Sequence, residues 1–191
     1  MLTLVIGGTR SGKSAVAERL AAAQGDGAVT YVATGTDTDD DPGMAARIAR
    51  HRARRPATWK TIEAAGSLHE VLGSIGGLAL VDSLGTWLAS LPGGETAALD
   101  ALVVALKERP GDTIVVTEEV GLSVHAPTEV GRRFADQLGE VNRRVAEVAD
   151  RCLLVVAGRV VELPTAPALE PASSAGSSMV RRPSRPSVAG L

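Results

Sequence analysis

The residue types best suited to chemistry occur near the start of the chain, in the run Gly7-Gly8-Thr9-Arg10-Ser11-Gly12-Lys13-Ser14. This run fits the pattern G-x-x-x-x-G-K-[ST], a loop whose backbone N–H groups surround a chain of phosphates. Glycine allows the tight backbone curl that such a loop needs. Lys13 would reach the β- and γ-phosphates, and the Ser14 hydroxyl would bind the Mg²⁺ ion that accompanies the nucleotide. The run therefore predicts a nucleoside triphosphate site.

The flanking residues predict the strand and the helix that this loop requires. Residues 1–6 form a short apolar run that is typical of a buried parallel strand. Residues 14–23 are rich in helix formers, and Val16, Leu20 and Ala23 fall on one face of the predicted helix. Because this helix begins at the loop, its N-terminus adds partial positive charge beneath the phosphates. This context disfavours an incidental glycine-rich turn.

Asp82 is the second candidate for holding the cation, because it ends the apolar run 78–82. A carboxylate at the end of a buried strand completes the magnesium site in proteins with this loop. The alternative is that Asp82 caps the helix predicted to follow it. Residues 28–34 and 113–117 read as further strands, and Glu118 follows the latter. Since the carboxyl ends of parallel strands meet at one edge of a sheet, we expect these residues to share one rim.

A basic segment, predicted to be a helix over 43–55, precedes Pro56 and contains His51 among several arginines. Two interpretations are open: a solvated basic face, or a second phosphate-binding surface with a histidine at its centre. The acidic loop 36–42 before it is expected to be solvated. The other two histidines are expected to have no catalytic role, with His69 facing solvent and His125 making local hydrogen bonds.

Composition narrows the class of protein. The chain has 191 residues, 45% of them hydrophobic and 22% charged, which is ordinary for one globular domain. A net charge of −2 provides no general attraction to nucleic acid or to a membrane surface. The single cysteine, Cys152, excludes an internal disulfide and is expected in the core. No apolar run approaches the ~18 residues of a membrane span, and the N-terminus reads as strand and loop rather than signal peptide. We therefore expect a cytoplasmic protein without stable membrane insertion.

The remaining pattern predicts an α/β fold, a three-layer sandwich of the phosphate-loop NTPase type with a mostly parallel sheet. Helices are expected at 67–75, 83–91, 95–109 and 128–150. The last of these has a predicted apolar stripe at Val130, Phe134, Leu138, Val141, Val145 and Val148. Strands at 152–157 and 160–163 flank Gly158-Arg159, which predicts a two-residue hairpin and an antiparallel edge. The domain spans 1–163, and the Pro-, Ser- and Ala-rich residues 164–191 are predicted to be a disordered tail.

In combination, these motifs resemble the bifunctional adenosylcobinamide kinase / adenosylcobinamide-phosphate guanylyltransferase family of cobalamin biosynthesis. The resemblance covers residues 1 to 163 and rests on the segments 7–14, 31–34, 44–52, 55–59, 80–82 and 119–121, with Glu63 and Asn142. The chain departs from the family pattern at His125-Ala126-Pro127, at Arg143, and at Ser83 and Gly85 after Asp82. These departures bear on the side of the site that receives the second substrate.

The resemblance implies two reactions on small-molecule substrates. First, the γ-phosphoryl group of ATP or GTP passes to the aminopropanol hydroxyl of adenosylcobinamide. Second, GTP loses pyrophosphate and leaves GMP on His51, from which adenosylcobinamide phosphate takes it to give adenosylcobinamide-GDP. The resemblance also implies a homo-oligomer, a trimer, and nucleotide contacts from Val32, Ala33, Thr34, Arg52, Ala53, Arg54, Arg55, Glu63 and Asp82 in addition to the loop.

The residues around His51 suit such a role. A nucleophilic histidine must be neutral when it attacks, and adjacent arginines disfavour a further positive charge. The same arginines would stabilise the charge that grows on the α-phosphoryl group and on pyrophosphate. Glu63 is a plausible acceptor for the N–H groups of guanine. Two rival functions require no His51: another small-molecule kinase, or a regulatory NTP-binding protein.

Overall fold

The structure is a computed structural model that describes residues 1–24, 28–35, 55–64, 67–91, 95–122 and 126–165. The predicted basic helix lies outside the described residues except for Arg55. The strands are β1 (Leu2–Gly7), β2 (Val29–Ala33), β3 (Lys60–Glu63), β4 (Leu78–Asp82), β5 (Thr113–Glu118), β6 (Arg151–Val156) and β7 (Arg159–Leu163). The helices are α1 (Lys13–Gln24), α3 (Leu68–Ser74), α4 (Leu84–Ala89), α5 (Glu95–Glu108) and α6 (Glu129–Val148). The predicted helices and strands within these residues are present, and β3 is an additional strand at one edge of the sheet.

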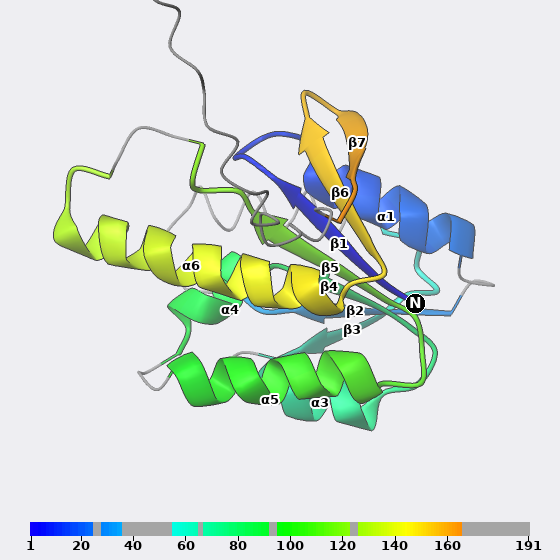
Figure 1. Cartoon of the computed structure of the whole chain (residues 1–191). Coiled ribbons are helices and arrows are strands. Elements are labelled where there is room, and N and C mark those ends of the chain that lie inside the picture. Colours follow the sequence, from blue (N-terminus) through cyan, green and yellow to red (C-terminus); the bar gives the residue numbers. More distant parts are fainter. Residues whose placement is uncertain (25–27, 36–54, 65–66, 92–94, 123–125, 166–191) are drawn as a thin grey trace, which may run out of the picture.

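One sheet contains all of these strands, in the order β3-β2-β4-β5-β1-β6-β7. Every neighbouring pair is parallel except β6 and β7, which are antiparallel. Figure 1 shows α1 on one face of the sheet and α3, α4, α5 and α6 on the other. The predicted three-layer α/β sandwich with an antiparallel edge is therefore confirmed. The order also places β5 between β1 and β4. The phosphate loop follows β1 and Asp82 ends β4, so the two lie on strands that are two positions apart.

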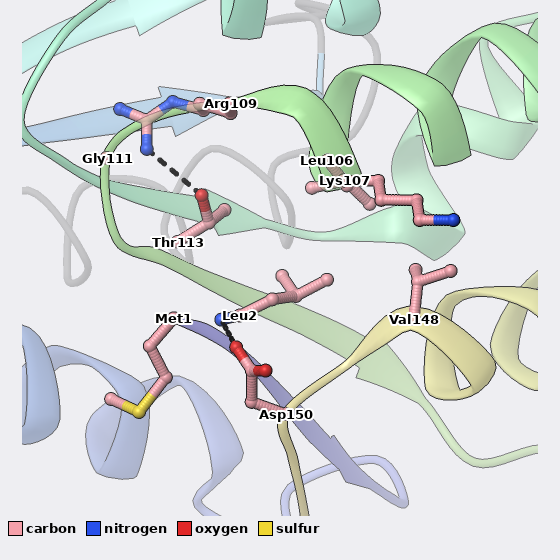
Figure 2. A pocket seen from close by; sticks show the side chains of 9 residues that line it. All are labelled: Met1, Leu2, Leu106, Lys107, Arg109, Gly111, Thr113, Val148 and Asp150. Carbon is pink, nitrogen blue, oxygen red and sulfur yellow. Dashed lines mark hydrogen bonds between the residues drawn. The ribbon is translucent and has the colours of Figure 1, made fainter.

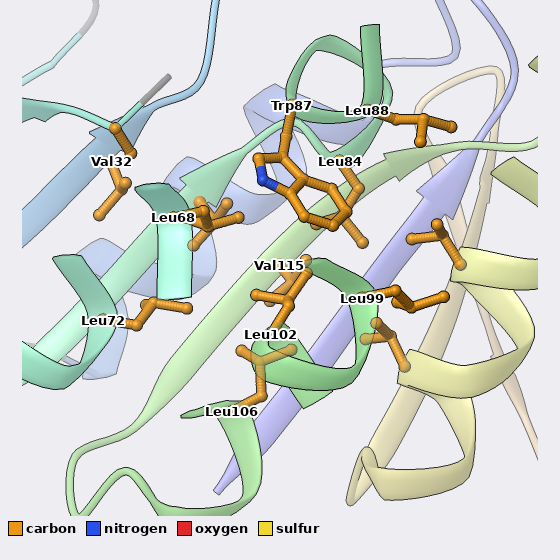
Figure 3. Packing of buried hydrophobic residues seen from close by; sticks show 14 of the residues in the cluster. Val32, Leu68, Leu72, Leu84, Trp87, Leu88, Leu99, Leu102, Leu106 and Val115 are labelled. Carbon is orange, nitrogen blue, oxygen red and sulfur yellow. The ribbon is translucent and has the colours of Figure 1, made fainter. Parts of the chain in front are cut away.

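Two hydrophobic clusters hold the layers together. One joins α1 to the sheet through Val16, Ala17 and Ala21, and the other lies under α3, α4, α5 and α6. The central strands are buried on both faces, as their uninterrupted apolar sequences require. Figure 3 shows Trp87 of α4 among leucines from α3 and α5 in the second cluster. Trp87 is fully buried, and its indole N–H finds no hydrogen-bond partner among the described residues.

Three details of the predicted packing are wrong. On α1, Ala23 is exposed, whereas Ala17 and Ala21 are buried beside Val16, because the helix turns a face of small residues to the sheet. On α6, Val130 is 79% exposed, since the first turn of this helix extends beyond the elements beneath it. His69 does not face solvent fully: it is half-buried, and its Nδ1 atom is enclosed without a hydrogen-bond partner among the described residues.

The hairpin at the sheet edge also differs in register from the prediction. Val156 pairs with Arg159, so the two turn residues are Ala157 and Gly158. Their φ angles of 50° and 74° are those of the type I′ turn that suits a right-twisted hairpin. Cys152 on β6 is half-buried and has a free thiol.

Two arginines of α6 have carboxylate partners within the molecule. Arg143 pairs with Glu140 and Glu147 on the same exposed helix face, and Arg144 binds Asp100 of α5 at 2.5 Å. These ion pairs account for both guanidinium groups without a bound phosphate. No helix among the described residues combines the length and the apolar character needed to cross a membrane.

Candidate functional site

The predicted phosphate loop joins the end of β1 to the start of α1. The Ser11 N–H donates to the Gly8 carbonyl at 3.1 Å, which closes a tight turn. Arg10 and Gly12 have positive φ angles of 60° and 93°, the backbone conformation that a curled loop requires. A Cβ atom added at Gly7 would lie 2.5 Å from the Val155 carbonyl oxygen, so only glycine fits there. The side chains of Thr9 and Arg10 are exposed, whereas the space around Gly8 is open.

The β6–β7 hairpin braces this loop from the side. The Gly158 N–H donates to the Ser11 carbonyl at 2.7 Å. A Cβ atom at Gly12 would lie 3.3 Å from the Cα atom of Gly158, so the two backbones are in close contact. No local sequence pattern predicts this contact, because it joins residues 147 positions apart and depends on the sheet order. The hairpin thereby fixes the outer side of the loop.

Lys13 lies at the base of the loop with only 3% of its surface exposed. Its Nζ atom is 3.5 Å from the Gly8 carbonyl oxygen and 3.4 Å from Oε1 of Glu118. Both distances are long for contacts of an ammonium group, which prefers about 2.8 Å to a carboxylate. Moving the ammonium toward a bound phosphate would therefore cost little interaction energy. Glu118 lies on the predicted rim, but no local sequence pattern pairs it with Lys13.

Glu118 is held in place by neighbours on three elements. Its Oε2 atom accepts hydrogen bonds from the Ser83 hydroxyl at 3.1 Å and from the Gly85 N–H at 3.2 Å. A Cβ atom at Gly85 would lie 2.2 Å from that oxygen, so a side chain there would displace the carboxylate. The Asn142 amide donates to the Glu118 carbonyl at 2.9 Å and accepts from Thr117 at 2.6 Å. The end of β5 is thus tied to α6 and to the start of α4.

Asp82 lies beside the start of α1, as the magnesium interpretation requires. The Ser14 hydroxyl donates to Oδ1 of Asp82 at 3.4 Å, and the Tyr31 hydroxyl donates to Oδ2 at 3.0 Å. Ser83, not Asp82, caps α4 and makes a capping box with Thr86, so the alternative role of Asp82 as a cap is wrong. Burial, followed by the Asp82 charge, raises the pKa of the Tyr31 phenol, which therefore stays protonated and donates.

The oxygen ligands offered by Asp82 and Ser14 suit Mg²⁺ bound together with a nucleotide better than a metal ion held by protein side chains alone. A carboxylate and a hydroxyl are the hard oxygen ligands that Mg²⁺ takes, usually with phosphate oxygens and water. Among the described residues, no cluster of three or more His, Cys, Asp or Glu side chains could hold a metal ion. A cation at Ser14 and Asp82 would therefore complete its shell with the nucleotide.

Of the other residues predicted to contact the nucleotide, some lie within the described part of the chain and some lie outside it. Arg55 lies with its guanidinium 3.5 Å above the ring of Tyr31, and Tyr31 in turn binds Asp82. Glu63 is exposed at the end of β3, next to Ala33 of β2. Val32 and Thr34 are fully buried, so any nucleotide contact from them would use the backbone. His51, Arg52, Ala53 and Arg54 lie outside the described residues.

A cavity of about 200 Å³ lies at the opposite end of the sheet, between the starts of β1 and β5. Figure 2 shows Arg109, Thr113 and Asp150 around it. The Arg109 guanidinium donates to the Gly77 carbonyl at 2.6 Å, to the Asp112 carbonyl at 2.8 Å and to the Thr113 hydroxyl at 3.0 Å. The Leu2 N–H donates to Asp150 at 2.6 Å. Because the protein itself already occupies these groups, the cavity is a poorer candidate site than the loop.

Comparison with known proteins identifies close relatives. A family model described as cobinamide kinase / cobinamide phosphate guanyltransferase matches residues 3–163, ending where β7 ends. Bifunctional adenosylcobalamin biosynthesis protein CobP of Pseudomonas aeruginosa is 43% identical over 166 residues, which cover 83% of this chain and 94% of that protein. Bifunctional adenosylcobalamin biosynthesis protein CobU of Escherichia coli K12 is 34% identical over 185 residues, covering 85% and 99%. The P4 protein from bacteriophage phi6 in complex with ADP aligns with a TM-score of 0.46 at 18% identity over 84% of this chain and 53% of its own, too low to support an argument.

Proposed function

Because this chain belongs to the family of bifunctional cobinamide kinases and cobinamide phosphate guanyltransferases, we propose that it performs both reactions through one nucleotide site. The substrates are adenosylcobinamide, adenosylcobinamide phosphate and GTP or ATP, and the final product is adenosylcobinamide-GDP. The observation that carries the proposal is the arrangement of Lys13, Ser14 and Asp82. They lie around a loop whose backbone has the curl of a phosphate cradle.

In the kinase step, the N–H groups of residues 8–14 hold the triphosphate of ATP or GTP, and Lys13 binds the β- and γ-phosphates. Ser14 and Asp82 hold the Mg²⁺ ion, which when bound neutralises phosphate charge. Lys13 stabilises the charge that shifts toward the leaving diphosphate as the γ-phosphoryl group moves to the substrate hydroxyl. The low exposure of Lys13 strengthens this electrostatic contribution, because water screens it weakly.

In the second step, a neutral His51 ring nitrogen attacks the α-phosphorus of GTP. A P–N bond forms, the bridging bond to the β-phosphate breaks, and pyrophosphate leaves with the electron pair. A phosphate oxygen of adenosylcobinamide phosphate then attacks the same phosphorus and releases the histidine. Arg52, Arg54 and Arg55 stabilise the growing negative charge, and Ala53 contacts the nucleotide within the same run. The backbone of residues 32–34 and the side chain of Glu63 also bind the nucleotide.

The position of Arg55 supports placing His51 near the loop. Arg55 stacks on Tyr31, whose hydroxyl binds Asp82, the carboxylate beside Ser14. Four residues of chain reach at most about 14 Å when fully extended, which limits the distance from His51 to Arg55. This distance is short enough for His51 to act at a nucleotide bound beside Asp82, which supports the proposal. We further propose that the protein is a homotrimer, which light scattering on the purified chain would measure.

The direct test uses GTP labelled at the α-phosphate. We expect wild-type protein to acquire an acid-labile covalent label, and His51→Ala to acquire none. His69→Ala is the matched control, because it removes a histidine of α3 that is remote from the loop in sequence and lies on another element. Label retained in His51→Ala would refute the nucleophile assignment. Phosphorylation of adenosylcobinamide without any label in wild type would favour a simple small-molecule kinase, and turnover with neither would favour a regulatory NTP-binding protein.

A further inference from the structure

The carboxylate of Glu118 lies beside the ammonium group of Lys13 in the phosphate loop. Glu118 ends β5 and is in register with Gly7, the first residue of the phosphate loop on the neighbouring strand β1. Its Oε1 atom is 3.4 Å from Nζ of Lys13. A lysine in this motif binds the β- and γ-phosphates. A carboxylate in contact with that ammonium is therefore next to the γ-phosphoryl group of a bound triphosphate.

A negative charge at this place needs a reason, because it repels the phosphates that the loop binds. Among the described residues, the Glu118 carboxylate contacts three donors: the Lys13 ammonium, the Ser83 hydroxyl and the Gly85 N–H. A group that only accepts has the hydrogen-bonding pattern of an ionised carboxylate. The surrounding structure thus holds a base beside the phosphate loop.

The two oxygens of Glu118 differ in what they can do. Oε2 is fixed by Ser83 and by the backbone of Gly85, on a segment that has no room for a side chain at residue 85. In the part of the chain that the structure describes, Oε1 has one long polar contact, to Lys13. When the triphosphate attracts the Lys13 ammonium, Oε1 loses that contact and faces the phosphoryl acceptor. We propose that Oε1 of Glu118 is the general base of the kinase step and takes the proton of the substrate hydroxyl, an inference that depends on the function proposed above.

The step balances without another reagent. The hydroxyl oxygen of adenosylcobinamide attacks the γ-phosphorus and forms a new O–P bond. The bond from the γ-phosphorus to the bridging oxygen breaks, and its electron pair leaves with the nucleoside diphosphate. The hydroxyl proton passes to Oε1 of Glu118, which returns it to water after the products leave. Guanylyl transfer occurs at the α-phosphorus through His51 and gives no proton to Glu118, so only the first reaction depends on this base.

A purely positioning role, in which Glu118 only orients Lys13, predicts a different pattern. Lys13 binds the triphosphate in both reactions, so a misplaced Lys13 would weaken nucleotide binding and slow both of them. A missing base would lower kcat of the kinase step alone and would remove the acid limb of its pH–rate profile. The two roles are therefore separated by comparing the reactions in one variant.

Glu118→Gln is the test variant, because the amide has the same shape and its oxygen still accepts from Ser83 and Gly85. We expect kcat for adenosylcobinamide phosphorylation to fall by roughly 10²–10⁴-fold, the usual contribution of a general base. The KM for nucleotide and the rate of covalent labelling by α-labelled GTP should change by less than about 3-fold, since neither reports on the lost proton transfer. Glu118→Asp keeps a carboxylate and should retain more kinase activity than Glu118→Gln.

The adjacent Glu119 provides the matched control. Its two carboxylate oxygens accept from the backbone N–H groups of Gly121 and Leu122 at 2.8 Å and 3.0 Å, so they do not face Lys13. We expect Glu119→Gln to phosphorylate adenosylcobinamide at the wild-type rate.

Three results would overturn the proposal for Glu118: kinase turnover in Glu118→Gln within about 5-fold of wild type, an unchanged pH–rate profile, or equal losses of kinase activity and labelling. If wild-type protein itself neither phosphorylates adenosylcobinamide nor takes the label, the proposed function fails instead.

Discussion

Arg109 and Asp150 at the amino end of the parallel sheet are held differently from Lys13 and Ser14 at its carboxyl end. At the amino end, Arg109 makes hydrogen bonds of 2.6–3.0 Å to Gly77, Asp112 and Thr113, and Asp150 binds the Leu2 N–H at 2.6 Å. At the carboxyl end, Lys13 is 3.4 Å and 3.5 Å from its partners, and Ser14 is 3.4 Å from Asp82. The first set has short hydrogen bonds to the protein, although Nε of Arg109 finds no partner among the described residues. The second set is close enough to be ordered but loose enough to exchange protein partners for a ligand.

This contrast makes the cavity at the amino end a poorer candidate site than the loop. A cavity lined by groups that already have short hydrogen bonds offers a ligand few free donors or acceptors. At the other end, the space around Gly8 in the loop is open. Among the described residues, the Lys13 ammonium and the Ser14 hydroxyl have only long polar contacts. We therefore expect substitutions at the carboxyl end to change activity more than stability, and substitutions at the amino end to do the reverse.

The largest expected effect is that of Lys13→Ala on the kinase reaction. Loss of the ammonium that binds the β- and γ-phosphates should lower kcat/KM by roughly 10²–10⁴-fold, as for other groups that stabilise transition-state charge. Lys107→Ala, which removes an exposed lysine that lines the amino-end cavity, is the matched control and should leave the kinase rate unchanged. Steady-state kinetics with adenosylcobinamide measures both. A normal rate in Lys13→Ala would show that the kinase site is elsewhere.

The reverse prediction concerns Arg109→Met. The guanidinium is buried, and burial lowers the pKa of Arg109 while the neighbouring Asp112 opposes that change. Methionine would keep part of the packing but leave three backbone carbonyls and a hydroxyl without their donor. We expect the free energy of unfolding to fall by about 3 kcal/mol, measured by urea denaturation, with kcat of the folded enzyme preserved. A variant as stable as the wild type would contradict the view that the Arg109 hydrogen bonds stabilise this end of the sheet.

A smaller effect should follow from Tyr31→Phe. The variant keeps the ring beneath Arg55 but loses the hydroxyl that donates to Oδ2 of Asp82 at 3.0 Å. A single hydrogen bond to a charged group contributes about 1.5–3 kcal/mol, and some of this loss should appear in the orientation of Asp82. We expect the Mg²⁺ concentration for half-maximal kinase activity to rise several-fold, with GTP labelling retained at saturating Mg²⁺. An unchanged Mg²⁺ dependence would remove Tyr31 from the cation site.

The smallest effect concerns Cys152, which is paired with Leu4 near the amino end of the sheet. Burial raises the pKa of the Cys152 thiol, so the thiolate fraction at pH 8 is lower than that of a free cysteine. Alkylation by iodoacetamide should therefore be slower in the native protein than in the unfolded chain, and Cys152→Ala should retain both activities. If the native protein is alkylated as fast as free cysteine, the amino end of the sheet carries a reactive group. The difference between the two ends would then be smaller than we propose.

The sequence predicted most of the framework and the inner part of the candidate site. The loop at 7–14, the strand ending at Asp82 and the edge hairpin each have a local pattern that does not depend on distant residues, and the structure has all three. Local patterns did not reveal the Lys13–Glu118 contact or the Gly158–Ser11 hydrogen bond. Both join segments more than 100 residues apart, and both exist only because β5 and β6 lie on either side of β1.

The errors have the same origin. Periodicity placed Val130 on the buried stripe of α6, but only the sheet and neighbouring helices determine how far that stripe is covered. The hairpin was expected to turn at Gly158-Arg159, because glycine marks a turn without fixing which neighbour shares it; pairing of Val156 with Arg159 sets the register. The role of Tyr31 had no local signal, since its hydroxyl meets Asp82 through adjacent strands.

The most direct test of where the nucleotide binds is hydrogen exchange measured at short labelling times with and without Mg²⁺ and GTP. Phosphates bound by the loop should slow exchange of the N–H groups at 8–14 and around Gly85, and should leave those at 111–113 unchanged. Slowed exchange at 111–113 without any change at 8–14 would contradict the account, because it would place the ligand in the cavity at the amino end of the sheet.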